Sequence, residues 1–253
     1  VVHSHDAYPF LKYYLPHRLL RPALPVVVTF HGYEGYPIPW EARVLRAIVS
    51  RLTRGAICAG AFIPKWYGCH CDAITHGGVD APAQVAREAP QARQGAVFVG
   101  RLEPDTGFLM YLDALCLLKD RGLGLSLDVC GEGSLLTQAQ RLAAERGLDV
   151  RFHGVAADPI PYLSRARFAF VSGFLAILQA MASGAVVLAV YDNPLKHDYL
   201  TLCPGARYLC IAGSAEELAD HVQTLLRDPE ATAGLTAAAA AFAATQTWAK
   251  VAD

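Results

Sequence analysis

Short apolar runs alternate with segments in which apolar residues recur at helical spacing over most of this chain. From Ala96 onward the alternation is regular, and six strand-like runs cover residues 96–99, 125–130, 150–153, 168–171, 185–190 and 208–211. Helical spacing fills residues 107–119, 135–145, 160–165, 174–182 and the region from 215 onward. Because helices that connect parallel strands make right-handed crossovers, this order predicts a doubly wound α/β sheet.

The first part of the chain has the same character on a smaller scale. Strand-like runs at residues 1–2, 25–30, 56–58 and 73–75 accompany helical segments at 9–20 and 40–52. Residues 81–94 contain few large apolar side chains and two prolines, which is typical of a connector. We therefore predict a partial first lobe over residues 1–80, a connector over 81–94, a complete α/β lobe over 95–213 and C-terminal helices over 214–253.

Composition and charge narrow the class of protein. The 253 residues are 53% hydrophobic and 18% charged, which excludes global disorder and allows a sizeable core. With 22 basic and 23 acidic residues, the formal net charge is -1, and the basic residues are scattered. This pattern gives no electrostatic indication of a nucleic-acid partner or of membrane association. The longest apolar runs have strand length, far short of the roughly 20 residues that a membrane-spanning helix needs.

The seven cysteines leave at least one thiol unpaired under any disulfide scheme, which favours a reducing cytoplasm. Cys69, His70 and Cys71, with His76 nearby, raise the hypothesis of a zinc site. A second ligand pair at the spacing of a zinc site is missing, so we expect ordinary loop or buried thiols and no metal. The chain begins with Val and has no signal-peptide pattern, and we expect the natural N-terminus to precede it.

Glycines and polar residues stand at the ends of four predicted strands of the second lobe. These ends are Gly100-Arg101, Gly131-Glu132-Gly133, His153-Gly154 and Ser172-Gly173. In an open parallel sheet, ligands dock outside the carboxyl ends of the strands, where helix N-termini present N–H groups to anions. We therefore expect a phosphorylated small molecule at this edge. The second motif lacks the third glycine of a dinucleotide fingerprint, which disfavours NAD and leaves a plain strand-to-helix turn as an alternative.

In order and spacing, these motifs and Leu178–Gly184 resemble the nucleotide-sugar lobe of glycosyltransferase family 4. Thr29-Phe30-His31-Gly32 resembles the family's strand that ends in an active-site histidine, and Gly77 followed by Gly78-Val79-Asp80 resembles its interlobe turn. Trp248 matches its closing aromatic residue. The left-handed backbone of such a turn suits Gly77.

The resemblance implies two Rossmann-like lobes of the GT-B type. The second lobe would hold a nucleoside-diphosphate sugar, and the first would hold an acceptor, which is an unknown carbohydrate, lipid or other small molecule. Transfer would retain the anomeric configuration. Basic side chains and helix dipoles would stabilise the departing diphosphate in place of a metal, and no cofactor is implied besides the donor substrate.

The resemblance also assigns roles to single residues. His31 and Arg101 are the predicted catalytic residues, with Arg101 on the donor phosphates; a surface pair of Arg101 with Glu103 is the alternative. Predicted donor contacts are Gly100, Gly131, Glu132, Gly133, His153, Gly154, Ser172, Gly173, Phe174 and Gln179. Of these, the backbone N–H groups of Ser172 and Gly173 would receive the diphosphate, and Gln179 a ribose hydroxyl. His153 would frame the nucleobase, or it is an ordinary structural histidine.

Three positions depart from the family pattern. Thr106 stands near where the family has a lysine, and Thr106 or Asp105 is expected to cap the following helix instead. Val171 and Gln179 occupy the positions of a pair of carboxylates. These departures leave open a non-catalytic sugar-nucleotide-binding relative, and a sugar-nucleotide epimerase is a third hypothesis. The family begins with further strands, so we expect an exposed sheet edge and poor solubility or activity of this chain alone.

Overall fold

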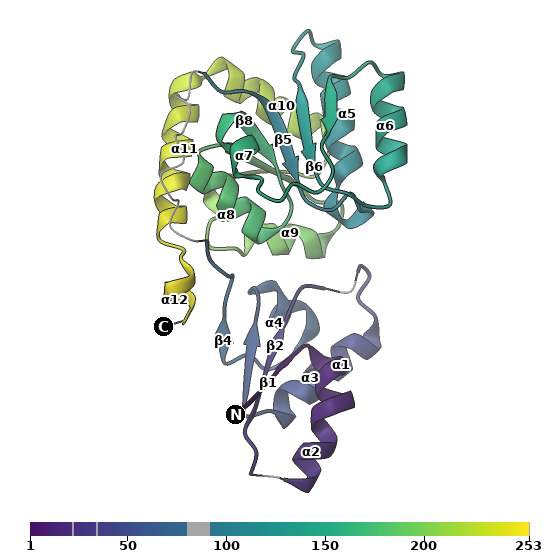
Figure 1. Ribbon diagram of the computed structural model, residues 1–253, viewed down its shortest axis with the longest axis vertical. Coiled ribbons are helices and arrows are strands. Elements are labelled where there is room, and N and C mark those ends of the chain that lie inside the picture. Colours follow the sequence, from purple (N-terminus) through teal and green to yellow (C-terminus); the bar gives the residue numbers. More distant parts are fainter. Residues whose placement is uncertain (22, 34, 80–91, 253) are drawn as a thin grey trace. The chain divides into compact units, whose positions relative to one another are not determined.

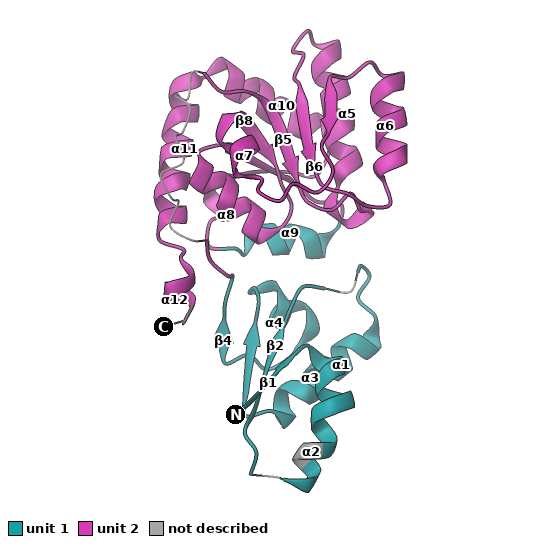
Figure 2. Cartoon of the chain, viewed as in Figure 1, with its two compact units in different colours: residues 1–76, 193–203 teal, residues 77–192, 204–253 magenta. Residues whose placement is uncertain are grey.

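The computed structural model describes residues 1–21, 23–33, 35–79 and 92–252. The chain forms two compact units (Figure 2). Unit 1 comprises Val1–His76 and Asn193–Cys203, and unit 2 comprises Gly77–Asp192 and Pro204–Asp253. Most of the predicted connector, residues 81–91, lies outside the described residues, as does Asp80, so the predicted domain boundary stays a prediction.

Unit 1 is built on a sheet of four parallel strands (Figure 1). In spatial order these are β1 (Val2–His5), β2 (Val26–Phe30), β3 (Gly55–Cys58) and β4 (Ala73–Ile74). Its helical segments are α1 (Ala7–Pro9), the π-helical turn η1 (Phe10–Tyr14), α2 (Leu15–Leu20), α3 (Trp40–Leu52), α4 (Phe62–Tyr67) and α9 (Pro194–Thr201). Phe10, Val28 and Phe30 are fully buried in its core, which fixes β2 as the central apolar strand.

Unit 2 is built on a sheet of six parallel strands in the order β10-β9-β8-β5-β6-β7. These are β5 (Gln94–Val99), β6 (Leu127–Cys130), β7 (Val150–Phe152), β8 (Ala166–Phe170), β9 (Val186–Val190) and β10 (Leu209–Ala212). The predicted doubly wound α/β sheet is therefore confirmed. Every residue of β9 is buried, as expected for a central strand that has helices over both faces.

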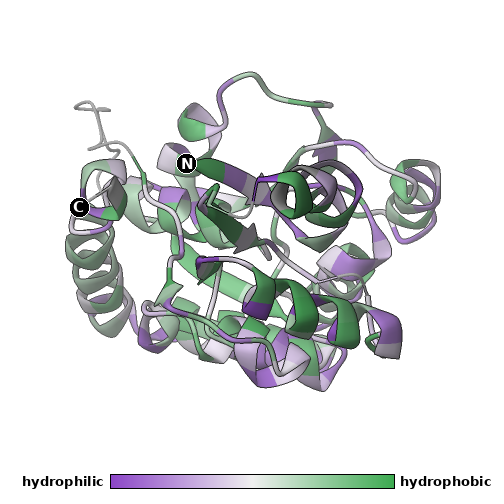
Figure 3. Ribbon diagram, turned by 90° about the horizontal axis from the view of Figure 1, so that it is seen from below, coloured by the Kyte–Doolittle hydropathy of each residue, from purple (hydrophilic) through white to green (hydrophobic). Residues whose placement is uncertain are grey.

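Helices cover both faces of this sheet (Figure 1). They are α5 (Phe108–Asp120), α6 (Leu136–Glu145), α7 (Ile160–Arg165), α8 (Phe174–Ser183), α10 (Ala215–Arg227), α11 (Pro229–Ala244) and α12 (Trp248–Ala252), with the short 3-10 turns η2 (Pro104–Thr106) and η3 (Ala206–Tyr208). Helix α5 packs against α6 and α10, whereas α8 packs against α7 and α11. Hydrophobic and hydrophilic residues alternate along many of the helices, as the colouring of Figure 3 shows.

The strand order changes direction between β5 and β8. From β5 the chain continues to β6 and β7 on one side, and it then returns to β8, β9 and β10 on the other side. Phe98 of β5 lies opposite Phe170 of β8 in the register. The loops that follow these two strands therefore diverge to opposite sides, which is the position where open α/β sheets bind ligands.

The pattern of apolar residues did not predict α4 and α9. Helix α9 begins with Asn193 as its N-cap, whose Oδ1 accepts the Lys196 N–H at 2.9 Å, and Pro194 follows at the first helical position. Its contacts group it with unit 1: Asp198 accepts hydrogen bonds from Trp66 Nε1 at 2.7 Å and from Lys65 Nζ at 2.6 Å. None of the helices in the described part of the chain has the length and hydrophobicity needed to cross a membrane.

Candidate functional site

The carboxyl ends of β5 and β8 carry some of the predicted donor contacts of unit 2. Gly100 and Arg101 follow β5, and the three residues Val171–Gly173 connect β8 to α8. Gly173 is the N-cap of α8, is exposed, and makes no side-chain capping hydrogen bond. Because β5 and β8 are neighbours in register, Arg101 and the N-terminus of α8 leave the sheet at the same edge.

Arg101 extends into solvent and forms an ion pair within its own loop. Its Nη2 lies 2.8 Å from Asp105 Oδ2, and the side chains are 69% and 46% exposed. The alternative partner, Glu103, instead accepts hydrogen bonds from the Ser134 hydroxyl at 2.6 Å and from the Ser134 N–H at 3.0 Å. These two bonds hold the pKa of Glu103 below its usual range. The guanidinium of Arg101 is thus held by a carboxylate of its own loop.

The expected helix cap is wrong for both candidate residues. Helix α5 has Gly107 as its N-cap and no side-chain capping bond. Asp105 pairs with Arg101, and the Thr106 hydroxyl donates to the Glu103 carbonyl at 2.7 Å. The intervening 3-10 turn η2 explains the difference, because it moves the helix start past both side chains.

The glycines of the second motif are required by the close approach of two loops. A Cβ at Gly131 would lie 1.8 Å from the Gly100 carbonyl oxygen, and one at Gly133 would lie 2.3 Å from that of Leu102. The Leu102 N–H donates to the Glu132 carbonyl at 2.8 Å, which joins the loops after β5 and β6. Tight packing between the loops therefore accounts for the small residues.

His153 and Gly154 follow β7 and lie beside the same pair of loops. His153 Nε2 is 2.6 Å from Asp128 Oδ1, and its ring centroid is 4.8 Å from that of Tyr162. Gly154 has φ +69, and a Cβ there would meet Glu132 Oε1 at 3.2 Å. His153 is therefore held by a carboxylate and an aromatic ring, which fits the structural alternative, and its side chain is still 29% exposed.

The short loop before α8 explains the departure at Val171. Its side chain is fully buried, and its N–H donates to the Leu188 carbonyl at 3.2 Å, so the residue extends the sheet. Ser172 is buried, whereas Gly173 is exposed and Phe174 is half-buried. Gln179 is half-buried within α8. The loop thus offers main-chain groups, and it has no acidic side chain.

His31 follows β2 in unit 1 and is exposed. Its N–H donates to Asp6 Oδ1 at 2.9 Å, and its Nε2 lies 2.9 Å from His5 Nδ1. Arg46 donates to the carbonyls of His31 and Gly32, each at 3.2 Å. The turn that carries His31 is therefore fixed from both sides.

We did not predict from the sequence that His5, Asp6 and Arg46 contact the turn that carries His31. Arg46 is 2% exposed, stacks 4.0 Å above the Tyr67 ring, and lies 3.7 Å from Asp6 Oδ1. Asp6 adopts φ 64 and ψ 169, a conformation that residues other than glycine rarely adopt. A usable signal was the His-Ser-His-Asp segment at the end of β1, because neighbouring parallel strands bring their carboxyl ends together.

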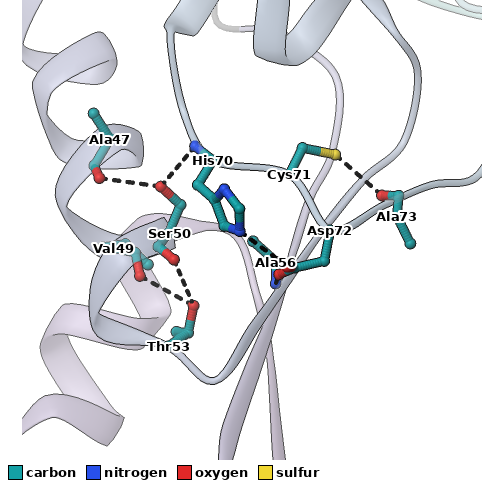
Figure 4. A network of polar contacts seen from close by, with 9 residues as sticks. All are labelled: Ala47, Val49, Ser50, Thr53, Ala56, His70, Cys71, Asp72 and Ala73. Carbon is teal, nitrogen blue, oxygen red and sulfur yellow. Dashed lines mark hydrogen bonds and ion pairs between the residues drawn. The ribbon is translucent and has the colours of Figure 1, made fainter.

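The segment of the zinc hypothesis has other partners (Figure 4). His70 Nε2 lies 2.9 Å from Asp72 Oδ1, and Cys71 Sγ donates to the Ala73 carbonyl at 3.2 Å. The Ser50 hydroxyl accepts the His70 N–H at 3.0 Å. Across the described ranges, no three His, Cys, Asp or Glu side chains are grouped to hold a metal ion.

The interlobe turn packs on the start of α12. Gly77 has φ +75, the left-handed backbone expected there. The Val79 N–H donates to the Gln246 carbonyl at 2.9 Å, and a Cβ at Gly78 would lie 2.5 Å from the backbone of Thr247. Trp248 is 3.3 Å from a Cβ built at Gly77, so the predicted closing aromatic residue contacts the turn.

Comparison with known proteins adds the following findings. A family described as Glycosyl transferases group 1 matches residues 93–228. No curated protein matches the chain. Solved structures with a similar fold include Anabaena Alr3699/HepE in complex with UDP, with a TM-score of 0.73 at 18% identity, covering 93% of this chain and 72% of that chain.

Two further structures agree in fold. A glycosyltransferase from Rickettsia africae ESF-5 has a TM-score of 0.72 at 17% identity, covering 98% of this chain and 72% of that chain. The pneumococcal O-GlcNAc transferase GtfA in complex with UDP and GlcNAc has a TM-score of 0.67 at 14% identity, covering 90% of this chain and 50% of that chain. These likenesses confirm the predicted fold of two Rossmann-like α/β units.

Proposed function

Because the chain belongs to the glycosyl transferases group 1 family, we propose that it transfers a sugar from a nucleoside-diphosphate donor to an acceptor. The observation that carries this proposal is the position of Arg101 and the N-terminus of α8. Both follow neighbouring strands at the point where the strand order of unit 2 changes direction. The complexes of HepE and GtfA with UDP support a uridine nucleotide as the first donor to test.

Cleavage of the sugar–phosphate bond builds negative charge on the departing diphosphate. Preorganised positive groups at that position are therefore the largest source of rate enhancement open to the protein. Arg101 would supply a planar pair of N–H donors, and the backbone at Ser172 and Gly173 would supply the positive end of the α8 dipole. In this proposal the reaction needs no metal ion and no cofactor.

Unit 1 would contribute His31. His31 is exposed at a strand end, its backbone N–H donates to Asp6 and its ring contacts His5, so the imidazole is oriented to donate to the transferring sugar or to an acceptor hydroxyl. Transfer with retention of the anomeric configuration is part of the proposal. Seven free thiols suit a reducing compartment such as the cytoplasm.

The second candidate function is donor binding without turnover. It is favoured by the buried side chain of Val171 and by the amide of Gln179, because the pair of carboxylates expected from the resemblance is absent there. A Gln179→Glu variant separates the two functions. A large gain in sugar transfer or donor hydrolysis would indicate a weakened enzyme, whereas unchanged inactivity with intact donor binding would indicate a binding protein.

A binding screen of UDP-, GDP- and ADP-sugars by calorimetry tests the donor site. We compare the parent with Arg101→Ala and with Arg141→Ala, a matched control in which an exposed arginine pairs with Glu145 four residues later. Loss of a charged phosphate contact of about 1.5–3 kcal/mol weakens binding roughly tenfold to a hundredfold in Arg101→Ala. Equal affinities of the parent and Arg101→Ala, or no binding by the parent, would refute the phosphate role.

A further inference from the structure

Helix α3 of unit 1 turns an apolar stripe toward solvent. Trp40, Val44, Ile48 and Leu52 follow one another at intervals of four residues, and their side chains are 69%, 47%, 47% and 39% exposed. A spacing of four residues places successive side chains on one face of a helix. A helix on the surface of a globular protein normally has its polar residues on that face, so the stripe indicates a partner that is not water.

The opposite face of α3 already has a role in the fold. Arg46, Val49 and Ser50 are buried against unit 1, and Arg46 holds the turn that carries His31. The helix is therefore anchored in its present orientation, and the face with the stripe is not the face that packs in the core of unit 1. Rotating the helix to bury Ile48 would break the contacts of the Arg46 guanidinium.

Positive charge accompanies the stripe. Arg43 and Arg51 lie on the exposed part of the same helix, and exposed Arg54 follows it. Among the described residues none of these three arginines forms an ion pair; Arg51 Nη1 donates to the Ala47 carbonyl at 2.8 Å. Glu41 is the one acidic residue of α3. The surface therefore combines four large apolar side chains with a net positive charge.

Aromatic and basic side chains also occur in α1, which contacts α3, and in η1, which follows α1. Helix α1 contacts α3, and Tyr8 and Tyr13, which are 65% and 57% exposed, flank the ammonium group of Lys12 at 5.9 and 5.3 Å from their ring centroids. Tyrosine, tryptophan and basic side chains are enriched where a protein contacts the boundary between lipid headgroups and acyl chains.

We propose that α3 docks unit 1 on an anionic lipid surface, with the stripe inserted at the boundary between headgroups and acyl chains. Arginines beside an apolar helix face provide both parts of such binding, the burial of apolar area and the attraction to acidic headgroups. A second copy of the chain fits the charge less well, because a symmetric contact would bring the arginines of two helices together. One helix of 13 residues also offers less than the roughly 800 Å² per partner of a stable dimer.

Sedimentation with lipid vesicles tests this proposal. The purified chain is mixed with vesicles of phosphatidylcholine that contain phosphatidylglycerol, and with vesicles of phosphatidylcholine alone. We expect binding to the first and at least about tenfold weaker binding to the second. Raising the salt concentration from about 0.1 M to about 1 M shortens the screening length from about 10 Å to about 3 Å and should weaken the binding.

Three variants separate the contribution of apolar burial from that of attraction to acidic headgroups. Ile48→Glu should weaken binding at least about tenfold, and the Arg43→Gln/Arg51→Gln pair should weaken it about fivefold for each arginine. The matched control is Val251→Glu, an exposed β-branched residue in helix α12 of unit 2, and it should bind like the parent. Circular dichroism checks that each variant is folded.

The tryptophan at the start of the stripe gives a second readout. Emission of the parent should shift to shorter wavelength on addition of anionic vesicles, and Trp40→Phe should lose that shift. No sedimentation with anionic vesicles, or equal sedimentation of the parent and Ile48→Glu, would overturn the proposal. A dimer in ultracentrifugation that Ile48→Glu dissolves, without vesicle binding by the parent, would assign the stripe to a second copy of the chain instead.

Discussion

Substitution of Asp6 tests how the turn with His31 is held in place. The Asp6 side chain accepts the His31 N–H at 2.9 Å and lies 3.7 Å from the Arg46 guanidinium, and its own backbone has φ 64 and ψ 169. The side chain therefore stabilises the turn while the backbone conformation costs free energy. Three variants, Asp6→Ala, Asp6→Gly and Asp6→Asn, separate these two effects.

The magnitudes follow from the geometry. A hydrogen bond to a charged group contributes about 1.5–3 kcal/mol. The ion pair with Arg46 adds at most about 1 kcal/mol, because the Asp6 side chain is 39% exposed. The positive φ costs about 1–3 kcal/mol for a residue other than glycine. Asp6→Ala loses the hydrogen bond and keeps the strain, so we expect a loss of about 2–3 kcal/mol in stability.

The other two variants should be milder. Asp6→Gly loses the same hydrogen bond but relieves the strain, and we expect it to be about 1 kcal/mol more stable than Asp6→Ala. Asp6→Asn keeps an oxygen acceptor for the His31 N–H and loses only the charge, so about 1 kcal/mol is expected. Hydrogen exchange of the His31 amide and urea unfolding measure these differences. Equal stability of the Gly and Ala variants, or unchanged exchange at His31 in Asp6→Ala, would refute the reasoning.

Three further predictions concern the loops, the thiols and α9. Gly131→Ala should unfold unit 2 or lower its melting temperature strongly, because the new methyl group would meet a carbonyl oxygen at 1.8 Å, whereas Gly124→Ala, with nothing within 4 Å, should be mild in the same thermal scan. The hydrogen bond from the Cys58 thiol lowers the pKa of Cys69 to about 7, so thiolate absorbance should appear near neutral pH and move to higher pH in Cys58→Ala. Burial would raise the pKa of Asp198, but hydrogen bonds from its lysine and indole partners hold it below 3.8. Its contribution to stability is therefore present above that pH and declines as the pH falls below it, so Asp198→Asn should be destabilising at pH values near 7, and this effect should shrink on acidification below 3.8 in denaturant titrations.

The fold of unit 2 was predictable because local patterns determine it. Apolar runs of strand length alternate with helical spacing from Ala96 onward, and right-handed crossovers leave few arrangements of such a chain. The assignment of α9 to unit 1 was not predictable. It depends on Asp198 meeting Trp66, and the two residues are 132 positions apart, so no local pattern connects them.

In the candidate site, too, residues marked by a local pattern were predicted, whereas contacts between distant parts of the chain were not. His31 and Arg101 were predicted because each lies just after an apolar strand. The contact of His31 with His5 depends on the register of β1 and β2, in which His5 lies opposite Thr29. The glycines at 131 and 133 were predicted as a phosphate loop, and the structure shows a further requirement, because neighbouring carbonyl oxygens leave no room for a Cβ.

The ion pair of Arg101 makes donor binding depend on Asp105. A diphosphate that docks on the guanidinium must displace a carboxylate 2.8 Å away, and both side chains are largely exposed. An exposed pair of this kind is worth about 0–1 kcal/mol, so releasing it should strengthen donor binding by up to about fivefold. Asp105→Asn should therefore bind a nucleoside-diphosphate sugar more tightly than the parent in the same calorimetric screen, with Glu145→Gln, which releases Arg141, as the control that leaves the affinity unchanged. Weaker binding by Asp105→Asn would mean that the carboxylate orients Arg101 for the phosphate and does not compete with it.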